Sequence, residues 1–154
     1  MKQRDRVAMT GDETAALLAG SRKVQLATIG PDGAPHLVTM YYMLLDGQIA
    51  FWTYRASQKA RNLARDPRVT CLVETGDGYF DLRGVQVSGV ARCVEDPAGV
   101  LEIGRGVASG MEGVPADAVE EYVAHAARKR VGYVVEPARV ISWDHRKLVP
   151  GSGD

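Results

Sequence analysis

Three side chains that could bind a phosphate group stand close together in the middle of the chain. Arg55, Ser57 and Lys59 occupy alternate positions where an aromatic, strand-like segment changes into a helical one. Two cations, a hydroxyl group and the free backbone amides of a helix N-terminus can converge at such a junction, and this geometry suits a phosphate. The alternative is a solvated cationic helix face, because most charge runs simply lie on the surface.

The charge of this segment favours the phosphate site. Between residues 55 and 68 five basic side chains are opposed by one carboxylate, that of Asp66, although the whole chain is neutral, with 19 basic and 19 acidic side chains. A neutral chain has no global positive field that would hold a nucleic acid by counterion release, so we expect no nucleic-acid partner. The five cations are Arg55, Lys59, Arg61, Arg65 and Arg68.

Short strands and tight turns surround the phosphate-binding segment. A capping box at Thr10 predicts a helix over residues 10–20, and good helix formers before Pro67 predict another over 57–66. Runs of β-branched and aromatic residues, joined by turns such as Asp46-Gly47, predict strands. These strands cover residues 23–29, 36–45, 48–54, 69–74, 80–94 and 131–143, the last interrupted at Pro137.

Glycines in the second half of the chain have two different expected roles. Gly84 and Gly89 stand inside a long strand, where glycine usually marks a bulge, a bend or a close backbone approach. The composition turns helical over residues 96–130. Within that stretch Gly104–Gly110 resembles a dinucleotide-binding fingerprint, but its last spacing is wrong and no βαβ unit surrounds it. We expect a flexible segment that could act as a lid.

The overall pattern predicts an α+β fold: a small antiparallel β-barrel of about six strands with inserted helices. Apolar residues make up 45% of the chain and charged residues 25%, which is ordinary for a globular protein with a packed core. No linker or repeat divides the chain, so we expect a single domain over residues 1–154, with a flexible tail from about 149 to 154.

Other classes of site find little support. No window approaches about 18 consecutive apolar residues, so we expect a cytoplasmic protein with no secretory signal and no membrane span. Cys71 and Cys93 lack the spacing of a dithiol or zinc site, and the histidines lack metal-ligand spacing, so we expect no metal. His36 and His125 fit surface and packing positions rather than catalytic ones.

The motif Arg-x-Ser-x-Lys-x-x-Asn-Leu-x-x-Asp-Pro-Arg-Val, from Arg55 to Val69, follows an N-terminal helix, a Gly-Pro-Asp-Gly-x-Pro hairpin and an aromatic strand. This order resembles the flavin-reductase-like split β-barrel family related to pyridoxamine 5′-phosphate oxidase. It is most similar to the actinobacterial branch of small homodimeric oxidoreductases that use the deazaflavin coenzyme F420. The resemblance covers about residues 10–94 and 140–148.

The resemblance implies that the cofactor lies in a groove at a homodimer interface, with its phosphate on Arg55, Ser57 and Lys59. Arg61, Arg65 and Arg68 lie where they could meet the acidic oligoglutamate tail of F420. Candidate proton donors are Tyr41, Tyr42 and His145, the last in a C-terminal segment that reaches the groove in this family. Further cofactor-binding residues implied are Val38, Thr39, Met40, Phe51, Trp52, Thr53, Arg61 and Asn62.

The implied function is that of an oxidoreductase in which reduced F420 transfers a hydride to an electron-poor organic small molecule. Two alternatives stay open: an FMN-binding oxidoreductase of the same fold, and a non-catalytic protein that binds a flavin or deazaflavin. Vitamin B6 oxidation is not expected. The oxidase itself has an Arg and a Lys on its second strand and an Arg-x-His near its C-terminus, where this chain has Val38-Thr-Met-Tyr-Tyr42 and Trp143-Asp-His-Arg146.

Overall fold

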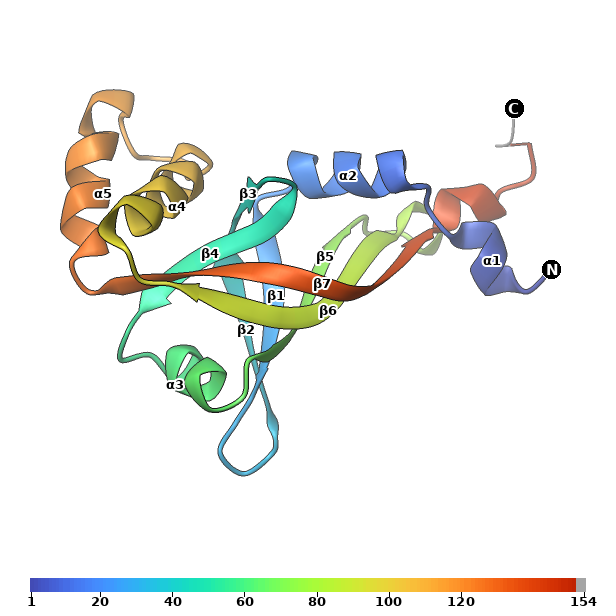
Figure 1. The fold of residues 1–154 in the computed structure, drawn as a ribbon. Coiled ribbons are helices and arrows are strands. Elements are labelled where there is room, and N and C mark those ends of the chain that lie inside the picture. The colour runs from blue at the N-terminus through green and yellow to red at the C-terminus, as the bar shows by residue number, and fades with distance from the viewer. Residues whose placement is uncertain (152–154) are drawn as a thin grey trace.

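Seven antiparallel strands build one curled sheet, a split barrel, in the computed structural model, which describes residues 1–151 (Figure 1). The strands are β1 (Lys23–Ile29), β2 (Pro35–Tyr41), β3 (Met43–Leu45), β4 (Gln48–Tyr54), β5 (Arg68–Thr75), β6 (Arg83–Val94) and β7 (Arg130–Asp144). Their order across the sheet is β2-β1-β5-β6-β7-β4-β3. The predicted α+β class and antiparallel barrel are confirmed.

Helices cover the sheet at several points, and the two predicted in the first half of the chain begin at side-chain caps. The hydroxyl of Thr10 accepts a hydrogen bond from the Glu13 amide at 3.1 Å, and the hydroxyl of Ser57 accepts one from the Ala60 amide at 3.2 Å. The helices are α1 (Gln3–Val7), which was not predicted, α2 (Gly11–Gly20), α3 (Gln58–Arg65), α4 (Pro97–Ser109) and α5 (Val119–Ala127). Three single turns complete the chain: η1 (Tyr79–Asp81), η2 (Ala116–Ala118) and η3 (His145–Leu148).

Tyr42 divides the predicted strand 36–45 into β2 and β3, which raises the number of strands to seven. Its side chain is only 3% exposed, and its hydroxyl donates to the carbonyl of Leu18 in α2 at 2.5 Å. Its amide donates to the carbonyl of Arg22 at 3.0 Å. The chain therefore turns at Tyr42, so that β2 pairs with β1 while β3 pairs with β4.

The long strand β6 pairs along its whole length with residues 132–144 of β7, and the two strands cross the middle of the sheet (Figure 1). The prediction that Pro137 interrupts the last strand is wrong. Strand β7 continues through Pro137, and only its pairing register with β6 shifts, opposite Ser88 and Gly89. A side chain at position 89 would collide with the carbonyl of Glu136, and one at position 84 with the ring of Trp143. Both glycines thus mark close approaches, as expected.

Strand β4 is buried on both faces, which decides where its aromatic residues point. Phe51 is 0% exposed and stacks on Tyr133 inside the barrel, with ring centroids 5.3 Å apart. Trp52 faces the other way, into a second core formed with α4 and α5. A side chain at Gly104 would lie 2.5 Å from the Trp52 ring. The expectation that residues 104–110 are flexible is therefore wrong for residues 104–109, because they belong to α4. Gly104 lets this helix pack closely against Trp52.

The two ends of the described chain lie close together. The final turn η3 packs against α1 and η1, at the end of β7 that is far from α4 and α5 (Figure 1). The expected flexible tail lies partly outside the described residues, which stop at 151. Within residues 1–151, no helix combines the length and apolar character needed to cross a membrane.

Candidate functional site

The end of β4 and the start of α3 form a cradle of two hydroxyl groups and one ammonium group. The Lys59 ammonium donates to the hydroxyl of Thr53 at 3.2 Å, and the Thr53 hydroxyl donates to that of Ser57, also at 3.2 Å. Among residues 1–151 no carboxylate lies within ion-pair distance of Lys59. Burial lowers the pKa of Lys59, because desolvation disfavours the charged form. An anion beside the ammonium would raise this pKa again, because it stabilises the charged form.

Arg130, the first residue of β7, places a second cation beside the cradle. Its guanidinium lies 4.1 Å from the ring centroid of Tyr54 and 5.1 Å from that of Trp52. One of its nitrogens also donates to the carbonyl of Ala126 at 2.9 Å. These contacts fix the orientation of the planar donor group. Nothing in the sequence near the phosphate motif indicated Arg130, because β7 pairs with β4 from the far end of the chain.

A hollow of about 290 Å³ joins Lys59 and Arg130, and we call it the β2–β4 groove. It is lined by Thr39, Met40, Tyr41, Trp52, Thr53, Tyr54, Lys59, Val107, Met111, Tyr122 and Arg130. None of these residues is acidic. Aromatic and thioether side chains form much of the wall, and two cations, Lys59 and Arg130, belong to the same lining. The groove thus offers a surface for a flat ring beside a site for a phosphate.

Six of the residues implied by the family resemblance line this groove, and the others do not. Thr39, Met40, Tyr41, Trp52, Thr53 and Lys59 lie in the lining, with Ser57 directly behind Thr53. Val38 packs against the core of the barrel, which also contains Phe51. Asn62 is 0% exposed, and its amide nitrogen donates to the Thr28 hydroxyl at 3.1 Å. Phe51 and Asn62 therefore cannot touch a ligand without unfolding their surroundings.

Arg55 lies apart from the cradle, contrary to the predicted convergence with Ser57 and Lys59. Its guanidinium donates to the carbonyl of Arg128 at 3.0 Å, and its amide donates to the carbonyl of Lys129 at 2.9 Å. These bonds tie the end of β4 to the segment between α5 and β7. The cation that the structure brings to the groove is Arg130 instead.

The other predicted cations near α3 differ in how they are engaged. Arg65 donates to the carbonyl of Ile29 and, at 3.3 Å, to the side-chain oxygen of Asn62. Arg68 forms an ion pair with Asp66 at 2.7 Å, which lowers the pKa of the Asp66 carboxyl to about 2. Arg61 is exposed and makes one long hydrogen bond, 3.4 Å, to Gln58. All three cations thus interact with acceptors of the chain itself, Arg61 through a single long hydrogen bond.

Of the three candidate proton donors, only Tyr41 lines the groove. Burial raises the pKa of Tyr42 to about 12 and its hydroxyl is bound to Leu18, so it cannot serve the groove. His145 follows the end of β7 opposite to Arg130, and its Nδ1 lies 2.8 Å from the carbonyl of Tyr79. Tyr54 and Tyr122, which were not predicted, place two further phenols at the groove.

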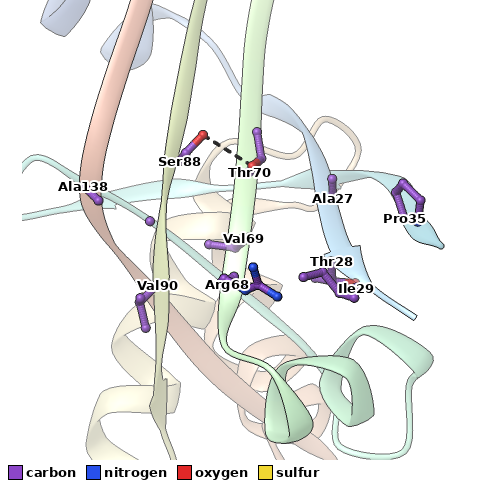
Figure 2. A pocket seen from close by; sticks show the side chains of 11 residues that line it. Ala27, Thr28, Ile29, Pro35, Arg68, Val69, Thr70, Ser88, Val90 and Ala138 are labelled. Atoms are coloured by element: carbon purple, nitrogen blue, oxygen red, sulfur yellow. Dashed lines mark hydrogen bonds between the residues drawn. The ribbon is translucent and has the colours of Figure 1, made fainter. Parts of the chain in front are cut away.

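A larger hollow, of about 590 Å³, lies on the outer face of the sheet, and we call it the sheet hollow (Figure 2). Figure 2 shows small and apolar side chains from β1, β5, β6 and β7 around it, with the hydroxyls of Thr70 and Ser88 paired at 3.4 Å. Its one charged residue, Arg68, is engaged by Asp66. Within the described part of the chain, no three His, Cys, Asp or Glu side chains are grouped to hold a metal ion.

Comparisons with known proteins show the family and the fold. Residues 10–144 match the family model of pyridoxamine 5′-phosphate oxidase. The structure of a conserved hypothetical protein from Mycobacterium tuberculosis is 44% identical, with a TM-score of 0.89, and the match covers 100% of this chain and 97% of that one. The structure of an F420 reductase is 27% identical, with a TM-score of 0.60, and the match covers 81% of this chain and 93% of that one. A heme-binding protein from Mycobacterium smegmatis shares the fold. It is 17% identical, with a TM-score of 0.64, and the match covers 92% of this chain and 61% of that one.

Proposed function

We infer that this chain, which belongs to the pyridoxamine 5′-phosphate oxidase family, is an oxidoreductase that binds the deazaflavin coenzyme F420 in the β2–β4 groove. Its reaction is the transfer of a hydride from the reduced coenzyme to an electron-poor organic molecule. The observation that carries this proposal is that Lys59 and Arg130 line the same groove as aromatic and thioether side chains, and that this lining contains no acidic residue.

The residues present fit such a coenzyme. Lys59, Thr53 and Ser57 can hold the phosphate oxygens through one ammonium and two hydroxyl groups already arranged around one point. Trp52 and Met111 can lie against the ring and exclude water from it. When bound, the reduced ring supplies the hydride. The phenol of Tyr41, in the groove lining, can hold the proton that the product needs.

One similarity favours F420 over FMN, and the composition of the second strand argues against a vitamin B6 oxidase. The F420 reductase is 27% identical to this chain, which supports the same coenzyme without deciding it. The strand β2, Pro35–Tyr41, contains no Arg or Lys, so the groove lacks the second-strand cations of a vitamin B6 oxidase. FMN would use the same phosphate cradle and is the competing cofactor. A protein that only carries the coenzyme would bind it without turning it over.

The absorbance spectrum of the freshly purified protein, followed by an assay with reduced F420, tests the proposal. We expect a protein without bound flavin that oxidises added reduced F420 in the presence of a quinone or nitroaromatic acceptor. Stoichiometric copurification of FMN would replace the proposal with the flavin alternative. Tight binding of F420 without oxidation by any acceptor tried would favour the carrier.

A further inference from the structure

A second hollow adjoins the β2–β4 groove at the junction of α5 and β7. Its volume is about 440 Å³, and we call it the basic hollow. Three residues, Tyr54, Tyr122 and Arg130, line both it and the groove, so the two spaces are neighbours that share these side chains. The lining consists of Tyr54, Tyr122, His125, Ala126, Arg128, Lys129 and Arg130.

The charge of the basic hollow is one-sided. Its lining contains two arginines, a lysine and a histidine but no acidic residue. In the described part of the chain, the side chains of His125, Arg128 and Lys129 have no hydrogen bond or ion pair to another residue. They are free to pair with a ligand, whereas the cations Arg65 and Arg68 beside α3 are engaged.

The backbone around the hollow is also prepared for an anion. The carbonyls at the C-terminus of a helix carry partial negative charge and would repel one. Here the guanidinium of Arg130 donates to the carbonyl of Ala126, and that of Arg55 donates to the carbonyl of Arg128. Two carbonyls at the end of α5 therefore already accept hydrogen bonds. The two guanidinium groups that donate these bonds are positively charged, which favours an anion nearby.

We propose that the basic hollow holds an acidic extension of the ligand bound in the groove, a flexible chain that carries several carboxylates. This inference rests on the proposed function, in which that chain is the oligoglutamate tail of F420. With the phosphate at Lys59 and Arg130, the part of the ligand beyond the phosphate continues past Arg130 toward Arg128 and Lys129. FMN ends at its phosphate and leaves the hollow empty. The hollow therefore distinguishes the two cofactors, and it replaces Arg61, Arg65 and Arg68 as the site of the tail.

The test compares F420 carrying a long glutamate tail with a form that ends before the first glutamate. Dissociation constants are measured at low salt for the unmodified protein and for the double variant Arg128→Ala, Lys129→Ala. The double variant Arg4→Ala, Arg6→Ala removes the same charge from α1 at the other end of the molecule. A third variant, Arg61→Ala, tests the surface of α3.

We expect the long-tailed form to bind the unmodified protein roughly threefold to tenfold more tightly, since each exposed ion pair adds a factor on the order of two to five. The ratio should fall to about one in the Arg128, Lys129 variant and stay unchanged in the α1 and Arg61 variants. It should also fade as salt rises, because the Debye length is only about 8 Å at physiological ionic strength.

Three results would overturn the inference, and they are distinguishable. If the tail preference survives in the Arg128, Lys129 variant, or disappears in the Arg61 variant, the tail lies elsewhere. If both forms of F420 bind the unmodified protein equally at low salt, the hollow does not hold the tail, while the proposed coenzyme stands. If neither form binds at all, the proposed function fails together with the inference.

Discussion

At the scale of single residues, the candidate site depends on which acceptors the side chains of Lys59 and Arg55 bind. Lys59 is half-buried, and its one bond goes to the Thr53 hydroxyl, a neutral partner that an anion can supplement. Arg55 stands in the same sequence motif, but its guanidinium is bound to the carbonyl of Arg128. The local sequence cannot distinguish these two cases, because the acceptor for Arg55 comes from a segment more than seventy residues away.

Replacing Lys59 by Ala should weaken binding of F420 and of FMN by about 1.5–3 kcal/mol, roughly 10–150-fold, because a charge-assisted bond to the phosphate is lost. The fold should stay intact, since the side chain makes only one hydrogen bond. The matched control is Arg61→Ala, which removes an exposed cation from the same helix. Titration of each variant with both ligands gives the dissociation constants. Unchanged affinity of the Lys59 variant for both would remove the phosphate from this cradle.

At the scale of elements, α4 shapes the groove because its glycines let it lie close to the sheet. Gly104 faces the Trp52 ring and Gly106 faces Met43, with no room for a side chain at either position. Val107 and Met111, at and just beyond the end of this helix, line the groove. The position of α4 therefore sets both the packing of the second core and the width of the groove.

Gly104→Ala should destabilise the protein by about 1–3 kcal/mol, because an added methyl group must displace either the helix or the Trp52 ring. Gly11→Ala, in the first turn of α2, is the control: nothing lies within 4 Å of the added atom, and alanine favours a helix over glycine. Urea unfolding of both variants measures the difference. Equal midpoints for the two would show that the Trp52 contact does not constrain α4.

The elements that the sequence predicts correctly are those specified by local chemistry. The Thr10 cap starts α2 as expected, α3 lies within the predicted helix 57–66, and Asp46-Gly47 joins β3 to β4. The break at Tyr42 could not be predicted, because its cause is a hydrogen bond to Leu18 that exists only in the folded chain. Arg130 was missed for the same kind of reason, since only the pairing of β7 with β4 brings it to the groove.

At the scale of the whole molecule, the sheet hollow is an apolar surface with no cover in a single chain (Figure 2). Leu37 is 65% exposed, and it lies opposite Ala27, which lines the hollow; Val90, another lining residue, is 42% exposed. Monomeric proteins seldom leave such a continuous apolar face in water. We propose that a second copy of the chain covers it in a two-fold homodimer.

Sedimentation equilibrium at micromolar concentration should therefore give the mass of a dimer. The double variant Leu37→Lys, Val90→Lys should shift the population to the monomer, because charges would be buried at the contact. Ala98→Lys with Ala124→Lys adds the same charge at exposed positions on α4 and α5 and should leave the dimer intact. A monomer in the unmodified protein, or a dimer that tolerates lysine at both sheet positions, would contradict the proposed interface.

We propose that the β2–β4 groove is built for F420 rather than FMN. The most direct measurement is an equilibrium competition at physiological salt, in which FMN is titrated against bound F420 in the purified apoprotein. We predict that F420 binds more tightly and that Lys59→Ala weakens both ligands, since both place a phosphate in the same cradle. Displacement of F420 by an equal or lower concentration of FMN would contradict the claim and make this chain a flavin-binding member of its family.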